Sequence, residues 1–169
     1  HPQEAMKLLP LICLTAMLGL TACGPQQNAY RNAAEVPSPD PRAKQLWGDN
    51  LEIAKAQAAK NNKLVFVDFT GSDWCPPCMA LHDHVLTQKA FLDFAEKNLE
   101  LVVIDFPKNK PLDEKVELAN RALAEQYKIG SFPTVLVLDV DGGVVHREEG
   151  FGNKNAQAYT ADLKKALNK

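Results

Sequence analysis

Three continuous runs of apolar residues predict the central strands of the chain. They are LVFVDFT (64–70), LELVVIDF (99–106) and TVLVLDV (134–140), all rich in β-branched and aromatic residues. Runs of this kind, without regular polar alternation, are typical of strands buried on both faces of a sheet. The third run ends at the turn signal Asp141-Gly142-Gly143, so VVHREEG (144–150) is expected to pair with it as an antiparallel strand.

Apolar residues elsewhere recur with the helical period of 3.6 residues. The expected helices cover four segments of the chain, at about 46–58, 79–98, 112–127 and 155–169. The second helix is expected to be interrupted around Thr87 to Lys89. The third presents a broad apolar face that includes Val116, Leu118 and Leu123. Helices that alternate with strands, followed by a hairpin, predict an α/β architecture with a mixed central sheet flanked by helices on both faces.

The beginning of the chain follows a different pattern. Met6 and Lys7 precede an apolar run from Leu8 to Leu20, which is shorter than the roughly 20 residues of a membrane-spanning helix and is typical of a signal peptide. The run continues into LTACG, which resembles the lipobox of bacterial lipoproteins. That resemblance implies that Cys23 receives the lipid and becomes the first residue of the mature protein.

Three segments follow from these patterns. Residues 1–22 are expected to be a signal peptide of lipoprotein type, with residues 1–5 as an extension upstream of Met6. Residues 23–42 contain four prolines and few apolar side chains, which predicts a flexible tether that starts at the acylated cysteine. Residues 43–169 are expected to form the folded domain.

Charge and cysteine content narrow the function. The formal net charge is −2 and charges of both signs are interspersed, so no basic surface indicates a nucleic acid partner. Of the four cysteines, Cys13 lies in the signal peptide and Cys23 in the lipobox, which leaves Cys75 and Cys78 as the thiols of the mature domain. The domain must therefore be stabilised by its core and not by a framework of disulfides.

Cys75 and Cys78 stand in GSDWCPPCMA (71–80), directly after the first strand. Two cysteines at this spacing are compatible with a metal clip, a structural disulfide or a redox pair. If Cys75 begins a helix, the partial positive charge of the helix N-terminus lowers its pKa below the value of about 8.5 for a free thiol. Pro76 and Pro77 have no N–H group to stabilise the thiolate, so we expect the pKa to be depressed only moderately.

Three features of the chain resemble the thioredoxin fold. WCPPC lies between a strand and a helix, Phe132-Pro133-Thr134 precedes the third strand, and Gly150 follows the hairpin. The resemblance covers about residues 43–169. It implies a thiol-disulfide oxidoreductase in which Cys75 is the nucleophile and Cys78 is the less exposed resolving thiol. No cofactor is expected besides this redox-active disulfide.

The same resemblance implies roles for the neighbouring residues. Pro133 is expected to form a cis peptide bond against the cysteine pair and to expose the backbone of Phe132 to an extended substrate. Trp74 is expected to shape the docking surface. Asp68, the acid within the first strand, matches a buried acid that assists proton transfer at the resolving cysteine, a role that a raised pKa would suit. The lysine that usually accompanies this acid is replaced, we expect by Leu101.

A metal site is the alternative use of the same residues. Cys75, Cys78 and His82 form C-x2-C-x3-H, and Asp83 or His84 would complete a zinc or copper site. His82 and His84 point to different faces of a helix, however, so we expect solvated histidines and no bound metal.

Together these features predict an exported, lipid-anchored reductase of disulfides in exported proteins, facing the periplasm or the cell exterior. The resemblance implies a membrane thiol reductase as electron donor, and a monomer is expected. Pro77, before the second cysteine, is typical of reducing members of the family. The alternatives are a disulfide oxidase or isomerase of the same fold, a copper-handling module that uses Cys75 and Cys78, and a non-catalytic peptide-binding domain.

Overall fold

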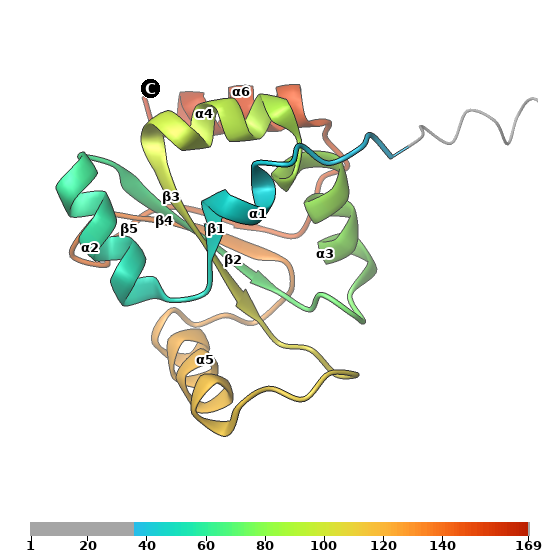
Figure 1. Ribbon diagram of the computed structural model, residues 1–169, viewed down its shortest axis with the longest axis vertical. Coiled ribbons are helices and arrows are strands. Elements are labelled where there is room, and N and C mark those ends of the chain that lie inside the picture. The colour runs from blue at the N-terminus through green and yellow to red at the C-terminus, as the bar shows by residue number, and fades with distance from the viewer. Residues whose placement is uncertain (1–35, 169) are drawn as a thin grey trace, which may run out of the picture. The chain divides into compact units, whose positions relative to one another are not determined.

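The computed structural model describes residues 36–168 of the chain. Five strands form one sheet in the order β1-β3-β2-β4-β5 (Figure 1). Their bounds are β1 (Trp47–Gly48), β2 (Leu64–Thr70), β3 (Leu99–Asp105), β4 (Thr134–Leu138) and β5 (Val144–Glu149). Strands β1 and β2 run parallel to β3, whereas β4 is antiparallel to β2 and β5 is antiparallel to β4. The predicted mixed sheet is confirmed, and β1 is an edge strand that the sequence pattern did not predict.

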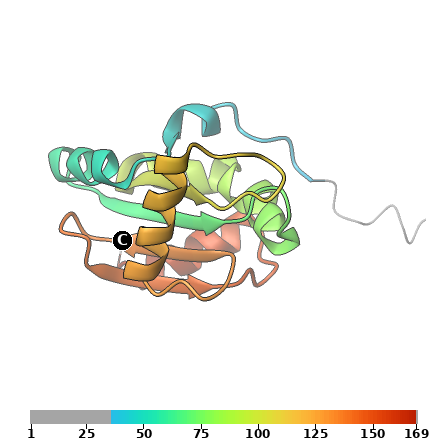
Figure 2. The same cartoon turned by 90° about the horizontal axis from the view of Figure 1, so that it is seen from below.

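Helices cover both faces of this sheet, as expected. They are α1 (Ala43–Leu46), α2 (Leu51–Asn61), α3 (Pro76–Leu81), the π-helix η2 (His82–Leu86), α4 (Lys89–Asn98), α5 (Glu114–Gln126) and α6 (Ala156–Ala166). Buried side chains of α1, α3, η2, α4 and α6 pack on one face. Helices α2 and α5 lie on the opposite face, where Figure 2 shows α5 crossing the strands.

Strand β2 supplies the centre of both hydrophobic layers, because its side chains alternate between the two faces. Phe66 points toward α4, where its ring lies 5.2 Å from that of Phe91 in an edge-on contact. Val67 and Phe69 point toward α2 and α5, and none of these β2 side chains has any exposed surface. The strand is therefore held on both faces up to the point where the cysteines begin.

The long helix predicted at 79–98 is broken where the sequence indicated. Helix α3 and η2 form one continuous helical segment that ends at Leu86, and α4 resumes at Lys89. The helix predicted at 46–58 instead begins at Leu51, because the side-chain oxygen of Asn50 accepts a hydrogen bond from the N–H of Ile53 at 3.0 Å and caps it there.

The segment before α1 packs against the domain, which shortens the flexible tether predicted for residues 23–42. The N–H of Asp40 donates to the carbonyl of Thr87 at 2.8 Å. Arg42 forms ion pairs with Asp93 at 2.8 Å and with Glu96 at 3.0 Å, both on α4. These contacts extend the packed part of the chain to the N-terminal side of the expected boundary at Ala43.

The expected apolar face of the third helix is not buried as a whole. In α5, Val116 and Leu118 are 43% and 60% exposed, and Asn120 is the fully buried residue. Leu123 packs on the second layer, and the Asn120 side chain donates to the carbonyl of Asp105 at 2.9 Å. The helix is thus attached by its C-terminal half and one amide, because the long loop before it carries its first turns away from the sheet.

Within residues 36–168 no helix is both long enough and apolar enough to cross a membrane. The predicted signal peptide and Cys23 lie outside the described residues.

Candidate active site

The two cysteines of the motif form a disulfide where β2 leads into α3. Cys75 is the N-cap residue of α3, and its Cα atom lies 5.2 Å from that of Cys78. Cys75 is 4% exposed and Cys78 is 1% exposed. The helix predicted to follow Cys75 is confirmed, and Cys78 is the less exposed of the two cysteines.

Hydrogen-bond donors around Cys75 are few. Pro76 and Pro77 occupy the first two helical positions and carry no N–H group. The N–H groups of Cys78 and Met79 donate to the carbonyl oxygen of Cys75 at 3.0 and 3.1 Å. The Cys78 amide, the nearest N–H group after the two prolines, is therefore already engaged with the backbone.

Trp74 is fixed beside the disulfide by three contacts. Its indole Nε1 donates to the carbonyl of Phe106 at 2.7 Å, and the Nζ atom of Lys108 lies 3.7 Å from its ring centroid. Its ring also meets Phe132 edge-on, with 5.9 Å between centroids. The indole packs so closely on Gly71 that a Cβ atom there would come within 2.5 Å of it, which explains the glycine at this position.

The loop after β3 is tied to the segment that precedes the cysteines. The carboxylate of Asp105 accepts from the N–H of Ser72 at 2.9 Å and from its hydroxyl at 2.6 Å. The carboxylate of Asp73 accepts from the N–H groups of Lys108 and Asn109 at 2.9 and 2.8 Å, which lowers the pKa of Asp73. These bonds hold the residues from Gly71 to Trp74 in place without relying on regular secondary structure.

The peptide bond between Phe132 and Pro133 is cis, as the resemblance implied. Pro133 is buried, and its carbonyl accepts from the N–H of Gly150 at 2.8 Å. Phe132 is half-buried between the rings of Trp74 and Phe106. The structure thus brings Phe132 and Trp74 into direct contact beside the cysteine pair.

Asp68 lies in the middle of β2 and is 4% exposed. Its Oδ1 atom has no hydrogen-bond partner among residues 36–168. Burial raises the pKa of Asp68 to about 7, and the negative charge of Asp105 adds to the effect. Across the sheet Asp68 pairs with Val103, whereas Leu101 pairs with Phe66. Val103, and not Leu101, therefore stands opposite the acid.

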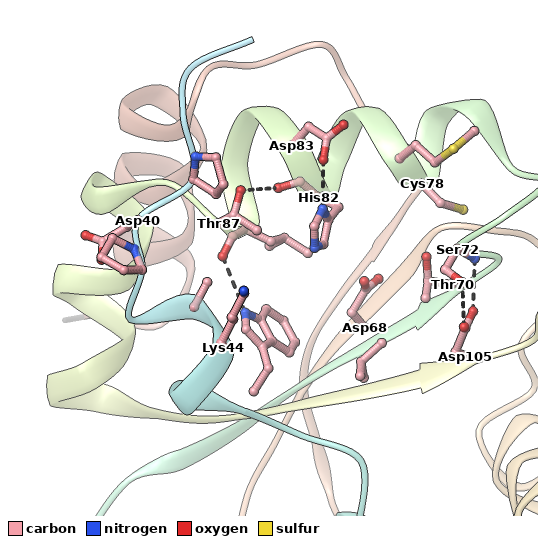
Figure 3. A pocket seen from close by; sticks show the side chains of 17 residues that line it. Asp40, Lys44, Asp68, Thr70, Ser72, Cys78, His82, Asp83, Thr87 and Asp105 are labelled. Carbon is pink, nitrogen blue, oxygen red and sulfur yellow. Dashed lines mark hydrogen bonds and ion pairs between the residues drawn. The ribbon is translucent and has the colours of Figure 1, made fainter.

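Asp68 and Cys78 line one cleft of about 920 Å³ (Figure 3). Its walls come from the segment before β1, from the ends of β2 and β3, and from α3 with η2. The residues that line the cleft include Lys44, Trp47, Asp68, Cys78, His82 and Asp105. The sequence did not predict that the segment before β1 lines this cleft, because the proline-rich composition of that segment is typical of a tether.

The histidines do not join the cysteines in a metal site. His82 is exposed, and its Nδ1 atom lies 2.8 Å from the Asp83 carboxylate. His84 is half-buried and does not line the cleft. Across residues 36–168 no group of three or more histidine, cysteine or acidic side chains is arranged to hold a metal ion.

A five-stranded mixed sheet with a CxxC disulfide at a helix N-terminus and a cis-proline loop beside it defines the class of thioredoxin-fold proteins with a redox-active cysteine pair. The family model described as a thioredoxin-like domain matches residues 51–166. The chain belongs to the thioredoxin-like family, and it is a thiol-disulfide oxidoreductase.

Individual relatives agree with this assignment. The disulfide bond reductase DsbH of Chlamydia pneumoniae is 30% identical over 151 residues, which cover 89% of this chain and 90% of DsbH. The solved structure of a DsbH oxidoreductase matches with a TM-score of 0.68 at 27% identity, over 83% of this chain and 98% of that chain. The thioredoxin-related protein DsbJ of the same organism is 30% identical over 109 residues, but these are 64% of this chain and only 31% of DsbJ.

We predict that the pKa of the reduced Cys75 thiol is lowered only moderately from that of a free thiol, because the helix dipole acts on it while amide donors are scarce. The rate of alkylation against pH in a Cys78→Ser variant measures it. The Pro77→Ala change adds an N–H group at the second helical position. The side chain of the N-cap residue, here Cys75, can accept a hydrogen bond from this N–H, so the change is expected to lower the pKa of Cys75. A pKa far below neutrality in the unmodified motif contradicts the argument.

We predict that Asp68→Asn stabilises the oxidised protein in neutral and alkaline solution. The folded pKa of about 7 is above the usual 3.8, so wild-type stability is complete below about pH 4 and falls as the pH rises toward 7. The free energy of unfolding of the variant should exceed that of the wild type by up to about 4 kcal/mol at about pH 8, and the difference should shrink toward about pH 4.

Urea unfolding at several pH values measures this difference. Asp162→Asn is the matched control, because Lys154 lowers the pKa of Asp162 and its stabilising effect is lost as the pH falls. A stability gain for Asp68→Asn that does not change with pH would contradict the account of a buried, ionising carboxyl.

Proposed function

We propose that this protein reduces disulfide bonds in exported proteins, with Cys75 as nucleophile and Cys78 as resolving thiol. The observation that carries the proposal is the Cys75–Cys78 pair at the start of α3 beside the cis Pro133 loop. It occurs in a chain that matches a disulfide bond reductase along 90% of that relative's length.

The reaction runs in two exchanges. The Cys75 thiolate attacks one sulfur of the substrate disulfide, and a mixed disulfide forms as the first substrate thiolate leaves. Cys78 then loses its proton and attacks the Cys75 sulfur, so the second substrate thiolate leaves. Both departing thiolates take up protons. Two electrons pass from the cysteine pair to the substrate, and the Cys75–Cys78 disulfide seen here is the oxidised product.

Asp68 accepts the proton of Cys78 in the second exchange. It lines the same cleft as Cys78, and its pKa of about 7 allows it to take and release a proton near neutral pH. The lining of this cleft also includes Thr70 and Asp105, but the Asp105 carboxylate is occupied by Ser72. The uncompensated oxygen of Asp68 makes it the better acceptor.

The substrate chain lies along Phe132 and Trp74. An extended segment of the substrate hydrogen-bonds to the backbone of the loop at Phe132, next to the cis Pro133. Trp74 offers a flat face that Lys108 partly covers, and Phe132 borders it. These side chains bind a polypeptide by shape more than by charge, which suits a reductase with several substrates.

Reduction, and not oxidation, is favoured by the residue before the second cysteine. Pro77 is typical of reducing members of the family, and the scarcity of donors around Cys75 limits stabilisation of its thiolate. A strongly stabilised thiolate makes a cysteine pair oxidising, so a weakly stabilised one keeps it reducing. Oxidase and isomerase activity remain the second candidate within the same fold.

The export and anchoring of the protein rest on the sequence before residue 36. We propose that Cys23 carries the lipid and that a membrane thiol reductase returns electrons to Cys75 and Cys78, since an exported reductant needs a supply through the membrane. A Cys23→Ala variant that still fractionates with membranes would contradict the anchor.

Removing each cysteine separates the two exchanges. Cys78→Ser is expected to accumulate a mixed disulfide at Cys75, because the resolving attack is lost, whereas Cys75→Ser should form no adduct and lose more than about 100-fold in disulfide reduction. Mass spectrometry of non-reduced samples with a peptide disulfide detects the adduct.

The substitution Asp162→Asn, at an exposed position of α6 outside the cleft, serves as a folding control. An adduct that forms equally in Cys75→Ser would show that Cys78 is the nucleophile and would overturn the assignment. Binding of the peptide with no adduct in any variant would favour the non-catalytic reading of the fold.

A further inference from the structure

The cleft beside Asp68 gives the buried acid a route to water. Asp68 itself is almost inaccessible, yet it lines a cleft of about 920 Å³ that Cys78 also lines. Most of the lining of this cleft is apolar, but the cleft is large enough to admit water molecules, which can bridge the polar groups of Asp68 and His82 in its walls. Each reaction cycle protonates Asp68 once, so the proton must leave before the next cycle.

His82 stands at the mouth of the same cleft. Its side chain is 61% exposed, and Nδ1 lies 2.8 Å from the carboxylate of Asp83, which is 49% exposed. Figure 3 shows the imidazole between Asp83 and the interior of the cleft, with the ring directed toward the side where Asp68 lies. The ring therefore meets bulk solvent and the cleft at once.

The π-helix holds His82 in this position. The carbonyl of His82 accepts from the N–H and the hydroxyl of Thr87 at 3.1 and 3.0 Å. The carbonyl of Asp83 accepts from the side-chain amide of Gln88 at 2.7 Å. Single π-turns in helices are frequently found at functional sites, and this one begins at His82.

The other charged groups around the cleft are poorer proton carriers. Asp40 is bound by Arg42, which lowers its pKa to about 2, and Asp105 is occupied by Ser72. From the α6 side, burial raises the pKa of Tyr159 well above its usual value, so it stays protonated.

We propose that His82, oriented by Asp83, relays the proton between Asp68 and solvent through water in the cleft. The proposal rests on the proposed function, because it deepens the second exchange. The Cys78 proton passes to the Asp68 carboxylate as Cys78 attacks Cys75. Water carries it from Asp68 to the free nitrogen of His82, which releases it to the bulk. His82 acts through Asp68 and does not touch the sulfur atoms.

The test compares the first resolving step with continuous turnover. Reduced protein is mixed with a peptide disulfide, quenched with acid at short times and analysed for the Cys75 adduct, whose decay is the attack by Cys78. In His82→Gln this first decay should keep the wild-type rate, because Asp68 has equilibrated with solvent before mixing. Continuous reduction of the peptide with dithiothreitol as the electron source should instead slow about tenfold near neutral pH, and added imidazole should restore it. His84→Gln, two residues further along η2, should turn over at the wild-type rate.

The first turnover also guards against a misfolded variant. A structural role for His82 would disturb the first decay as well, because Cys78 and Asp68 line the same cleft as His82. Turnover of His82→Gln at the wild-type rate, slower turnover that imidazole does not restore, or a first decay that slows as much as turnover each overturns the relay. These outcomes leave disulfide reduction by the wild type intact, whereas a wild type that forms no Cys75 adduct contradicts the proposed function itself.

Discussion

Strand β2 is buried on both faces from Val65 to its end at Thr70, and four residues separate it from Cys75. Its burial fixes the direction in which the chain leaves the sheet, while the close contact of Trp74 with Gly71 and the bond from its indole to the Phe106 carbonyl fix the segment that follows. The first turn of α3, and with it the disulfide, is placed by these contacts. The cleft, the cis-proline loop and the reactive pair keep their mutual positions only while this junction is rigid.

The same strand carries a buried carboxyl that the core does not compensate. An acid in the middle of a buried strand destabilises the fold whenever it is charged. Among residues 36–168 the Oδ1 atom of Asp68 has no hydrogen-bond partner, and Val103 stands opposite this residue on β3. Replacement by an apolar residue would give a more stable sheet. Retaining the carboxyl there makes physical sense if the site needs a proton acceptor beside Cys78, and the hydrated cleft with His82 at its mouth gives that acceptor an exit.

The sequence predicted those parts of the fold that depend on short-range pattern. Continuous apolar runs located β2, β3 and β4, and the helix break near Thr87 was visible from local composition. Contacts distant in the sequence were not predictable: β1 has only two residues, and the segment around Asp40 looked like a tether until its bonds to Thr87 and to α4 were seen. The residue opposite Asp68 depends on strand register, and the π-helix that begins at His82 has no signature in the helical period. The cysteines needed no such information, because their spacing and position after a strand are local.

The direction of electron flow is the central claim, and the equilibrium potential of the Cys75–Cys78 pair tests it most directly. The domain would be equilibrated in graded mixtures of a reduced and an oxidised thiol, with the two states separated by thiol trapping. A potential near that of thioredoxin, about −270 mV, is the result predicted for a reductase. A potential near about −120 mV, typical of a disulfide donor, would contradict the account and make this protein an oxidase.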